Sequence, residues 1–216
     1  MKKLFLIIGV FVLLISSCTI KQEYQFNDDF SGTAISTVDM SMLMGFMQGQ
    51  MAEGEQMNMK DTLEKSLVAI AEQLKIVGAT NIKYSWDNEI SLLSISYDFS
   101  DIELLNKALS NQNATGDILK GINASHATPS FSNKGKKKVI YHAAKLNKDA
   151  IKDVEQMESM KDYYKYELVI KFNKKIKKHS SKNAKLSADG KSISLEGSLF
   201  DLFDPELNTD IDFKLQ

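Results

Sequence analysis

Several stretches of the chain alternate between apolar and polar residues, which is the pattern of a β-strand with one buried face. The clearest spans Tyr164 to Phe172, in which every second side chain is aromatic or aliphatic. The same period returns at the end of the chain, where Ile211, Phe213 and Leu215 are separated by charged residues. In all, this pattern predicts strands over residues 24–26, 30–38, 82–86, 91–99, 138–142, 164–172 and 210–215, and a hairpin over 184–195.

Two turn sequences join neighbouring strands into hairpins. Asp87-Asn88 follows the first alternating arm, and Asp189-Gly190 is among the strongest short-range hairpin signals. Counting outward from each turn gives the expected register. The predicted partners are Tyr84 with Ser91, Ile82 with Leu93, Leu186 with Ile193 and Ala184 with Leu195.

Helical periodicity separates these strands. A stripe of apolar residues at helical spacing predicts a helix over residues 60–77, and Gly78 should end this helix. Ser100 followed by Glu103 fits a capping box at the start of a shorter helix, and we prefer this interpretation to a calcium loop, because the ligand spacing is wrong. Residues 146–160 give a third helical stretch. The stripe of the first helix consists of Leu63, Leu67, Ile70, Leu74 and Val77.

Strand–strand–helix succession, without strict β-α-β alternation, predicts an α+β fold. We expect a largely antiparallel sheet of hairpins with two or three helices packed on one face. Residues 24–216 are expected to form one domain. Residues 110–135, which are rich in Asn, Ser, Thr and Gly, are expected to form a long polar connection within it.

Methionine is concentrated in one segment. Asp39 can cap a helix whose apolar stripe is almost entirely methionine, and glycines weaken this helix. Methionine fills irregular core gaps and also builds adaptable apolar binding surfaces. The segment is therefore either an ordinary core helix or a lid over an apolar ligand, and residues 39–59 should be among the least ordered of the domain. The candidate ligand or lid residues are Met40, Leu43, Met44, Met47 and Met51.

The first eighteen residues have the features of an export signal. Lys2 and Lys3 precede an apolar run over residues 4–15, which is too short to cross a bilayer because a spanning helix needs roughly 20 residues. A basic start, a short apolar run and small residues at its end describe a secretory signal peptide. The alternatives are an uncleaved anchor or a buried first helix. After the run comes Cys18, the one cysteine of the chain.

The sequence from Ile15 to Cys18 resembles the lipobox of bacterial lipoproteins. This resemblance implies that residues 1–17 are removed and that Cys18 carries diacylglycerol and an amide-linked acyl chain such as palmitate. Residues 18–23 are then expected to form a lipidated tether. By the sorting rule of enterobacterial lipoproteins, Thr19 in place of aspartate implies the outer membrane, with either a periplasmic or a surface-exposed domain.

Composition and charge are those of a globular protein, with 43% hydrophobic and 25% charged residues and a formal net charge of -1. The charge is unevenly distributed. Residues 19–110 hold six lysines against fourteen acidic residues, whereas residues 130–191 hold seventeen lysines against seven acidic residues. Every basic residue is a lysine, so bidentate guanidinium contacts to phosphate or carboxylate are absent.

Two lysine runs stand out in the basic part. Solvated hairpin edges, where lysine discourages strand-to-strand aggregation, are the preferred interpretation. Contact with anionic lipid or lipopolysaccharide head groups is the second. Nucleic acid is not expected as a partner, because an exported protein rarely meets it and no aromatic residues are interleaved. The candidate head-group contacts are Lys136, Lys137, Lys138, Lys174, Lys175, Lys177 and Lys178.

No catalytic motif is present. His126, His142 and His179 share no metal-ligand spacing, and the chain lacks the HExxH, GxSxG and glycine-rich phosphate-binding patterns. Paired carboxylates occur only at turns and helix starts, where capping explains them. We therefore expect no enzyme activity, no cofactor and no metal.

Wider resemblance points the same way. The succession of residues 26–32, residues 38–41, the methionine-rich segment and the Trp86 hairpin resembles a group of uncharacterised lipoproteins of Bacteroidota. Residues 166–172 and 183–195 are similar to the LppM-type domain of actinobacterial lipoproteins, which implies an α+β fold concerned with lipids. The expected function is a non-catalytic envelope lipoprotein that acts as a structural or protein-interaction module. The alternative is a carrier of a lipid or other apolar ligand between the sheet and the methionine helix.

Overall fold

The computed structural model describes residues 18–41, 44–45, 53–87, 90–114, 125–146, 161–203 and 210–216. Strands predominate, with the α-helices α3 and α4 and two short 3-10 helices, and residues 41 and 44–45 are also helical. The elements are β1 (Cys18–Phe26), β2 (Gly32–Asp39), α3 (Glu53–Ile76), β3 (Thr80–Asp87), β4 (Leu92–Phe99), α4 (Ile102–Ala114), β5 (Ser125–Ala127), β6 (Ser130–Lys134), β7 (Lys138–His142), β8 (Lys145–Leu146), η2 (Lys161–Tyr163), β9 (Tyr164–Phe172), β10 (Ile176–His179), β11 (Lys185–Leu186), β12 (Ser192–Ser198), η3 (Leu199–Phe203) and β13 (Ile211–Leu215).

The large sheet has seven strands in the order β11-β12-β9-β1-β2-β4-β3. Every pair in it is antiparallel except β1 with β9, which run parallel in unbroken register from Cys18 opposite Tyr164 to Phe26 opposite Phe172. The prediction of a tether over residues 18–23 is therefore wrong. These residues form most of an inner strand, because their backbone groups pair with β2 on one side and β9 on the other.

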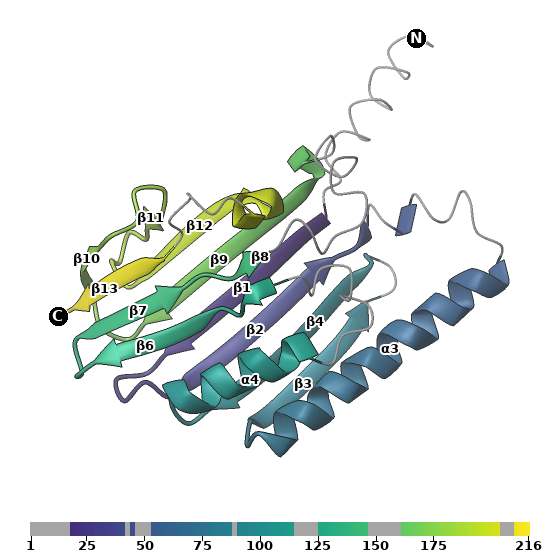
Figure 1. The fold of residues 1–216 in the computed structure, drawn as a ribbon, viewed down its shortest axis with the longest axis horizontal. Helices are drawn as coiled ribbons and strands as arrows, with labels where there is room; N and C mark the ends of the chain where they lie inside the picture. Colours follow the sequence, from purple (N-terminus) through teal and green to yellow (C-terminus); the bar gives the residue numbers. More distant parts are fainter. Residues whose placement is uncertain are drawn as a thin grey trace, which may run out of the picture.

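A second layer covers one face of the large sheet. It consists of α3, α4 and a four-stranded sheet in the order β10-β13-β7-β6 (Figure 1). The core lies between the layers, where Phe26 stacks on Phe172 at 5.4 Å and Phe172 meets Phe213 of the small sheet at 5.1 Å. The predicted α+β class, with helices on one face of a largely antiparallel sheet, is confirmed.

The small sheet itself was not foreseen. Strand β6 lies inside the stretch that composition assigned to a polar connection, and its one large apolar residue, Phe131, is fully buried. Asn106 of α4 covers the open edge of this strand. Its amide donates to the Phe131 carbonyl and its oxygen accepts from the Phe131 N–H, both at 2.8 Å. An edge strand closed in this way is protected from pairing with another chain.

The two predicted hairpin registers had different outcomes. Leu186 pairs with Ile193 as expected, although Leu186 is 48% exposed and only the β12 arm faces the core. In the first hairpin the predicted register is wrong by four residues, because Tyr84 lies opposite Ile95 rather than Ser91. Ser91 instead lies in the connection, with φ 53°, and its carbonyl accepts the N–H of Met40.

The helices confirm the predicted stripe and correct one cap. Helix α3 begins at Glu53 rather than near residue 60, buries Leu63, Leu67 and Leu74, and ends before Gly78, whose φ is 97°. Helix α4 is capped by Asp101 rather than by Ser100, since the Asp101 carboxylate accepts the Leu104 N–H at 2.8 Å. This bond lowers the pKa of Asp101. The helix predicted over 146–160 lies outside the described residues, apart from Leu146 in β8.

Candidate functional site

Cys18 is the first residue of β1 and pairs with Tyr164 at the start of β9. Its side chain is partly buried and carries a free thiol. Burial, and secondarily the negative charge of Asp39, raises the pKa of this thiol. A thiol with a raised pKa is a poor nucleophile at neutral pH, so the position has none of the activation of a catalytic cysteine.

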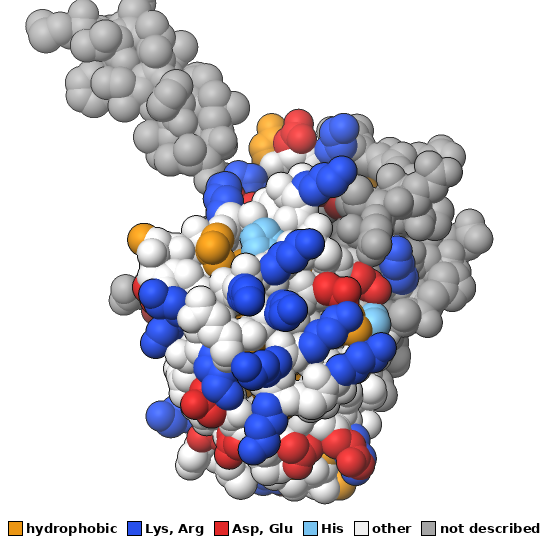
Figure 2. All heavy atoms as spheres, turned by 90° about the vertical axis from the view of Figure 1, so that its left-hand side faces the viewer, with side chains coloured by type: hydrophobic (Ala, Val, Ile, Leu, Met, Phe, Trp, Pro, Cys, Tyr) orange, Lys and Arg blue, Asp and Glu red, His pale blue; other side chains and the backbone are white. Residues whose placement is uncertain are grey.

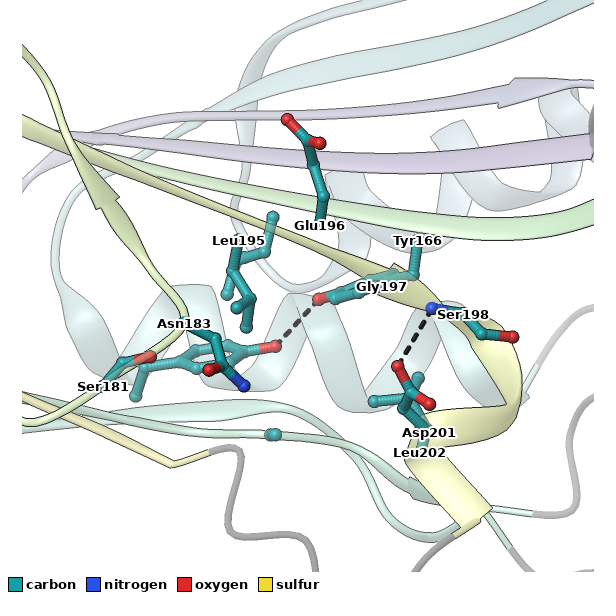
Figure 3. A pocket seen from close by; sticks show the side chains of 12 residues that line it. Tyr166, Ser181, Asn183, Leu195, Glu196, Gly197, Ser198, Asp201 and Leu202 are labelled. Atoms are coloured by element: carbon teal, nitrogen blue, oxygen red, sulfur yellow. Dashed lines mark hydrogen bonds between the residues drawn. The ribbon is translucent and has the colours of Figure 1, made fainter. Parts of the chain in front are cut away.

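Two cavities lie near the Cys18 end of the large sheet. An open groove of about 390 Å³ runs past Thr19, Lys165 and Glu196, so its walls carry charges of both signs. Next to it is a smaller cavity of about 70 Å³ between the two sheets, bordered by Tyr166, Asn183 and Leu202 (Figure 3). Sites for small organic ligands have volumes of roughly 300–1,000 Å³, so the smaller cavity is too small for a lipid chain, and the charged side chains along the groove make it a poor match for one.

A tyrosine network crosses from the small cavity into the core. The hydroxyls of Tyr141 and Tyr166 lie 3.1 Å apart, and Tyr166 and Tyr24 both donate to the side-chain oxygen of Gln22. Burial raises the pKa of Tyr166 to about 12, and it also raises the pKa of Tyr24 and of Tyr141 well above the usual value for tyrosine. All three remain neutral hydrogen-bond donors, and the network ties the two sheets together across their core.

On the outer face of the small sheet, three polar side chains from separate parts of the chain lie together. His142 Nδ1 lies 3.0 Å from a carboxylate oxygen of Asp210, and its Nε2 lies 3.3 Å from the Ser132 hydroxyl. The second oxygen of Asp210 accepts the Ala143 N–H at 2.9 Å. The sequence showed no such group, because the three residues are distant along the chain.

This trio has the connectivity of a serine–histidine–aspartate triad but lacks the surroundings of one. The side chains of His142 and Asp210 are 44% and 41% exposed, and neither of the two cavities is lined by Ser132. The N–H of Phe131 beside the serine is taken by Asn106, so it is not available to an oxyanion. We interpret the trio as a cross-strand hydrogen-bond cluster that fixes the entry to β13.

Acidic residues, histidines and the cysteine form no cluster able to hold a metal within the described parts of the chain. Those same parts contain no helix that is long and apolar enough to span a bilayer.

Two of the five candidate lid residues can be placed. Met40 and Met44 are each 8% exposed and pack against Leu63 of α3 in a small core cluster. Asp39 caps this segment as predicted, since its carboxylate accepts the Ser41 N–H at 2.9 Å. Neither cavity touches these methionines. Leu43, Met47 and Met51 lie outside the described residues, so the lid role and the low order of residues 39–59 stay predictions.

The two lysine runs, which are distant in sequence, lie at one end of the molecule. Lys136 and Lys137 form the β6–β7 turn, and Lys174 and Lys175 connect β9 to β10. The last residues of the chain lie between the two runs, because Leu215 donates to the Lys137 carbonyl at 2.8 Å and Gln216 to the Lys175 carbonyl at 3.0 Å. Figure 2 shows this end of the molecule as a broad field of lysine side chains.

This lysine end lies opposite Cys18. Strand β1 runs the length of the large sheet from Cys18 to Phe26, and the Phe26 carbonyl accepts the N–H of Asn173, next to Lys174. A strand of nine residues extends about 26 Å at ~3.3 Å per residue. The thiol and the lysines are therefore at opposite ends of the same strand.

These features define an α+β domain with a thiol at one end of its central strand, a lysine field at the other and a densely packed core. The chain is similar to the folded domain of LppM from Mycobacterium tuberculosis, solved by NMR, with 12% sequence identity and a TM-score of 0.44 over 93% of this chain and 90% of that one. No model of a known protein family matches the chain, and no curated protein matches it.

Proposed function

We propose that this protein is a bacterial envelope lipoprotein, held to a membrane by a lipid on Cys18, whose domain acts as a non-catalytic structural or protein-interaction module. The observation that carries the proposal is the position of Cys18. The one cysteine follows a short apolar leader and small residues, and it is also the residue at which the folded sheet begins. The enterobacterial sorting rule, applied to Thr19, favours the outer membrane.

The position of Cys18 has a consequence for how the domain is held. No free linker separates the cysteine from the sheet, because Cys18 already pairs with Tyr164. A lipid on this thiol brings the end of β1, the start of β9 and helix η2 close to the head groups. Two or more acyl chains make such an anchor stable, since each buried CH₂ contributes ~0.8 kcal/mol.

The packing of the domain favours a docking role over a carrier role. Met40 and Met44 pack into a core cluster with Leu63, as in an ordinary core helix. The groove and the small cavity are bordered by charged and hydrogen-bonded groups and lie away from this cluster. The charged surfaces, which are the lysine end and the groove near Cys18, remain as the surfaces that could recognise a partner.

The test is expression of the full chain in a bacterial host, followed by membrane fractionation and intact mass. The wild type should be found in the membrane fraction with a mass that corresponds to residues 18–216 plus diacylglycerol and an acyl chain. Cys18→Ala should keep the leader and carry no lipid. Ser17→Ala is the matched control, because it keeps a small residue before the cysteine and should therefore be cleaved and lipidated like the wild type. A wild-type protein that is membrane-bound without lipid would refute the anchor and favour the apolar leader as the membrane contact.

A second measurement addresses the carrier alternative. Lipidated protein extracted from membranes is analysed by native mass spectrometry after removal of detergent. The docking role predicts the covalent lipid alone. A second lipid bound with defined stoichiometry would overturn the docking role and support an apolar ligand site.

A further inference from the structure

Strand pairing brings four lysines into one row across the small sheet. Lys134 of β6 lies opposite Lys138 of β7, Lys138 lies opposite Lys214 of β13, and Lys214 lies opposite Lys178 of β10. Neighbouring strands are ~4.8 Å apart, so the row spans about 14 Å and crosses every strand of this sheet. Lys134 opens the first lysine run but is not among the candidate head-group contacts, and Lys214 belongs to neither run.

The row lies on the outer face of the small sheet. Directly paired residues point to the same side of a sheet, and side chains alternate along each strand. Val139 and Phe213, next to the two inner lysines, are fully buried, so Lys138 and Lys214 point away from the core. Lys134, Lys178 and Lys214 are exposed, and Lys138 is partly exposed.

Protection of sheet edges does not account for this row. Lysine on an edge strand discourages aggregation, which explains Lys134 on β6 and Lys178 on β10. Strands β7 and β13 are inner strands, and Lys138 and Lys214 have no edge to protect. Like charges directly opposite each other destabilise a sheet, so the row has an energetic cost that the fold does not require.

Carboxylates neutralise little of this charge. Asp212 lies 3.4 Å from Lys138, and Asp28 lies 3.8 Å from Lys174 in the neighbouring turn. Among the described residues, no ion pair involves Lys134, Lys178 or Lys214. Further lysines of the β6–β7 turn and of the β9–β10 connection widen the row into the field seen in Figure 2. We call the row and these flanking residues the lysine face.

The shape of the lysine face indicates what it binds. Neither of the two cavities described above is lined by any residue of the row. Figure 2 shows the lysine side chains at this end of the molecule spread over a broad surface. Flexible ammonium groups spread over a broad surface match a plane of many phosphates, to which each lysine contributes separately.

We propose that the lysine face binds the phosphate head groups of an anionic lipid bilayer. The face lies about 26 Å from Cys18 along β1, beyond the ~8 Å over which physiological salt screens charges. With β1 directed away from the membrane that holds the anchor, the lysine face is beyond the reach of that membrane's charge and meets a second bilayer. The protein bridges two membrane surfaces, and this last step rests on the lipid anchor proposed above.

The test uses the lipidated full protein reconstituted into donor vesicles of phosphatidylcholine. Acceptor vesicles contain either phosphatidylcholine alone or a mixture with phosphatidylglycerol, and their docking to immobilised donors is measured by fluorescence. Acceptors with phosphatidylglycerol should dock, acceptors without it should not, and high salt should release them. Flotation of the donors shows separately whether the protein is anchored, so failure of the anchor is distinguished from failure of the lysine face.

Variants locate the contact. Removing a lysine near an anionic surface weakens binding about fivefold, so Lys134→Gln, Lys178→Gln and Lys214→Gln together should reduce acceptor docking on the order of a hundredfold. The same three positions changed to arginine should retain docking, because the charge is preserved. The control removes the same net charge elsewhere, by Lys65→Gln, Lys83→Gln and Lys161→Gln, at exposed positions outside the lysine face.

Circular dichroism and thermal melting confirm that each variant is folded before docking is compared. Equal losses in the lysine-face and control variants would overturn the proposal, because they would reflect net charge alone. Docking that persists in the lysine-face variant would also overturn it. Binding of an acidic protein, without binding to phosphatidylglycerol vesicles, would assign the face to a protein partner instead.

Discussion

The conversion of Gly32 to alanine should be among the most damaging small changes in this protein. Gly32 is the first residue of β2 and lies opposite both Phe26 of β1 and Phe99 of β4. A Cβ atom added there would lie 1.9 Å from the Gln25 carbonyl oxygen and 2.8 Å from the Phe99 ring. Since such contacts essentially never fall below 3.0 Å, the backbone of β1 has to move by more than 1 Å.

The surrounding structure resists this movement. Rotation of the Phe99 side chain relieves the second contact, but the first is with backbone. Strand β1 is paired with β9 along all nine of its residues, so it cannot shift alone. Overpacking of this kind costs 1–3 kcal/mol where side chains adapt, and we expect about 3 kcal/mol or more here because a backbone atom is the obstacle. Domains of this size have unfolding free energies of roughly 5–15 kcal/mol, so the loss is a large share.

Thermal unfolding measures the effect. For a chain of this length each kcal/mol changes the melting temperature by about 2–4 °C, so Gly32→Ala should lower it by about 6–12 °C. Gly45→Ala is the matched control, because nothing lies within 4 Å of its added Cβ atom and the residue is helical. That variant should keep or raise the stability by about 0.5–1 kcal/mol. Equal melting temperatures for Gly32→Ala and the wild type would refute the close approach of the two strands.

Three further predictions concern single groups. Lys214→Gln should raise the free energy of unfolding by a few tenths of a kcal/mol at low salt, because it removes a lysine that lies opposite two other lysines. Urea titrations measure this gain, and the absence of a gain at any salt concentration would contradict the cost of like charges. Asp101→Ala should cost about 1 kcal/mol as a lost helix cap. Because the pKa of Asp101 is lowered in the folded protein, the difference in unfolding free energy between wild type and variant should have its full size above about pH 4. It should vanish as the pH falls through the lowered pKa. A difference that stays constant in acid would refute the cap. Burial raises the pKa of Tyr166 to about 12, so stability should fall as the pH rises from about 10 through 12, and its phenolate absorbance should develop together with unfolding rather than before it.

The elements that the sequence predicted correctly are those governed by local patterns. Strands β7, β9 and β13 follow from alternation, and the Asp189-Gly190 turn gives its register because the loop is short. The parallel pairing of β1 with β9 could not be foreseen, since no local signal connects residues 146 positions apart. The polar segment Thr19 to Glu23 has the composition of a tether, and only its pairing with β2 and β9 makes it a strand.

The same distinction between local patterns and non-local pairing applies to the candidate sites. Cys18 and the two lysine runs are visible in sequence because each is a local feature. The row of Lys134, Lys138, Lys214 and Lys178 depends on the pairing of four strands, and β6 was hidden in a stretch of polar composition. The contact of His142 with Asp210 depends on the same non-local pairing.

The parallel pairing of β1 with β9 also sets the order in which the protein can fold. Strands β1 to β4 can pair as soon as they leave the ribosome or a translocation channel, but the second edge of β1 has no partner until residue 172 follows. Closing a loop of this length is slow, and until it closes the unpaired edge of β1 can form hydrogen bonds with strands of other chains. A chain that stops short of β9 therefore exposes an unpaired strand edge at what should be the middle of its sheet.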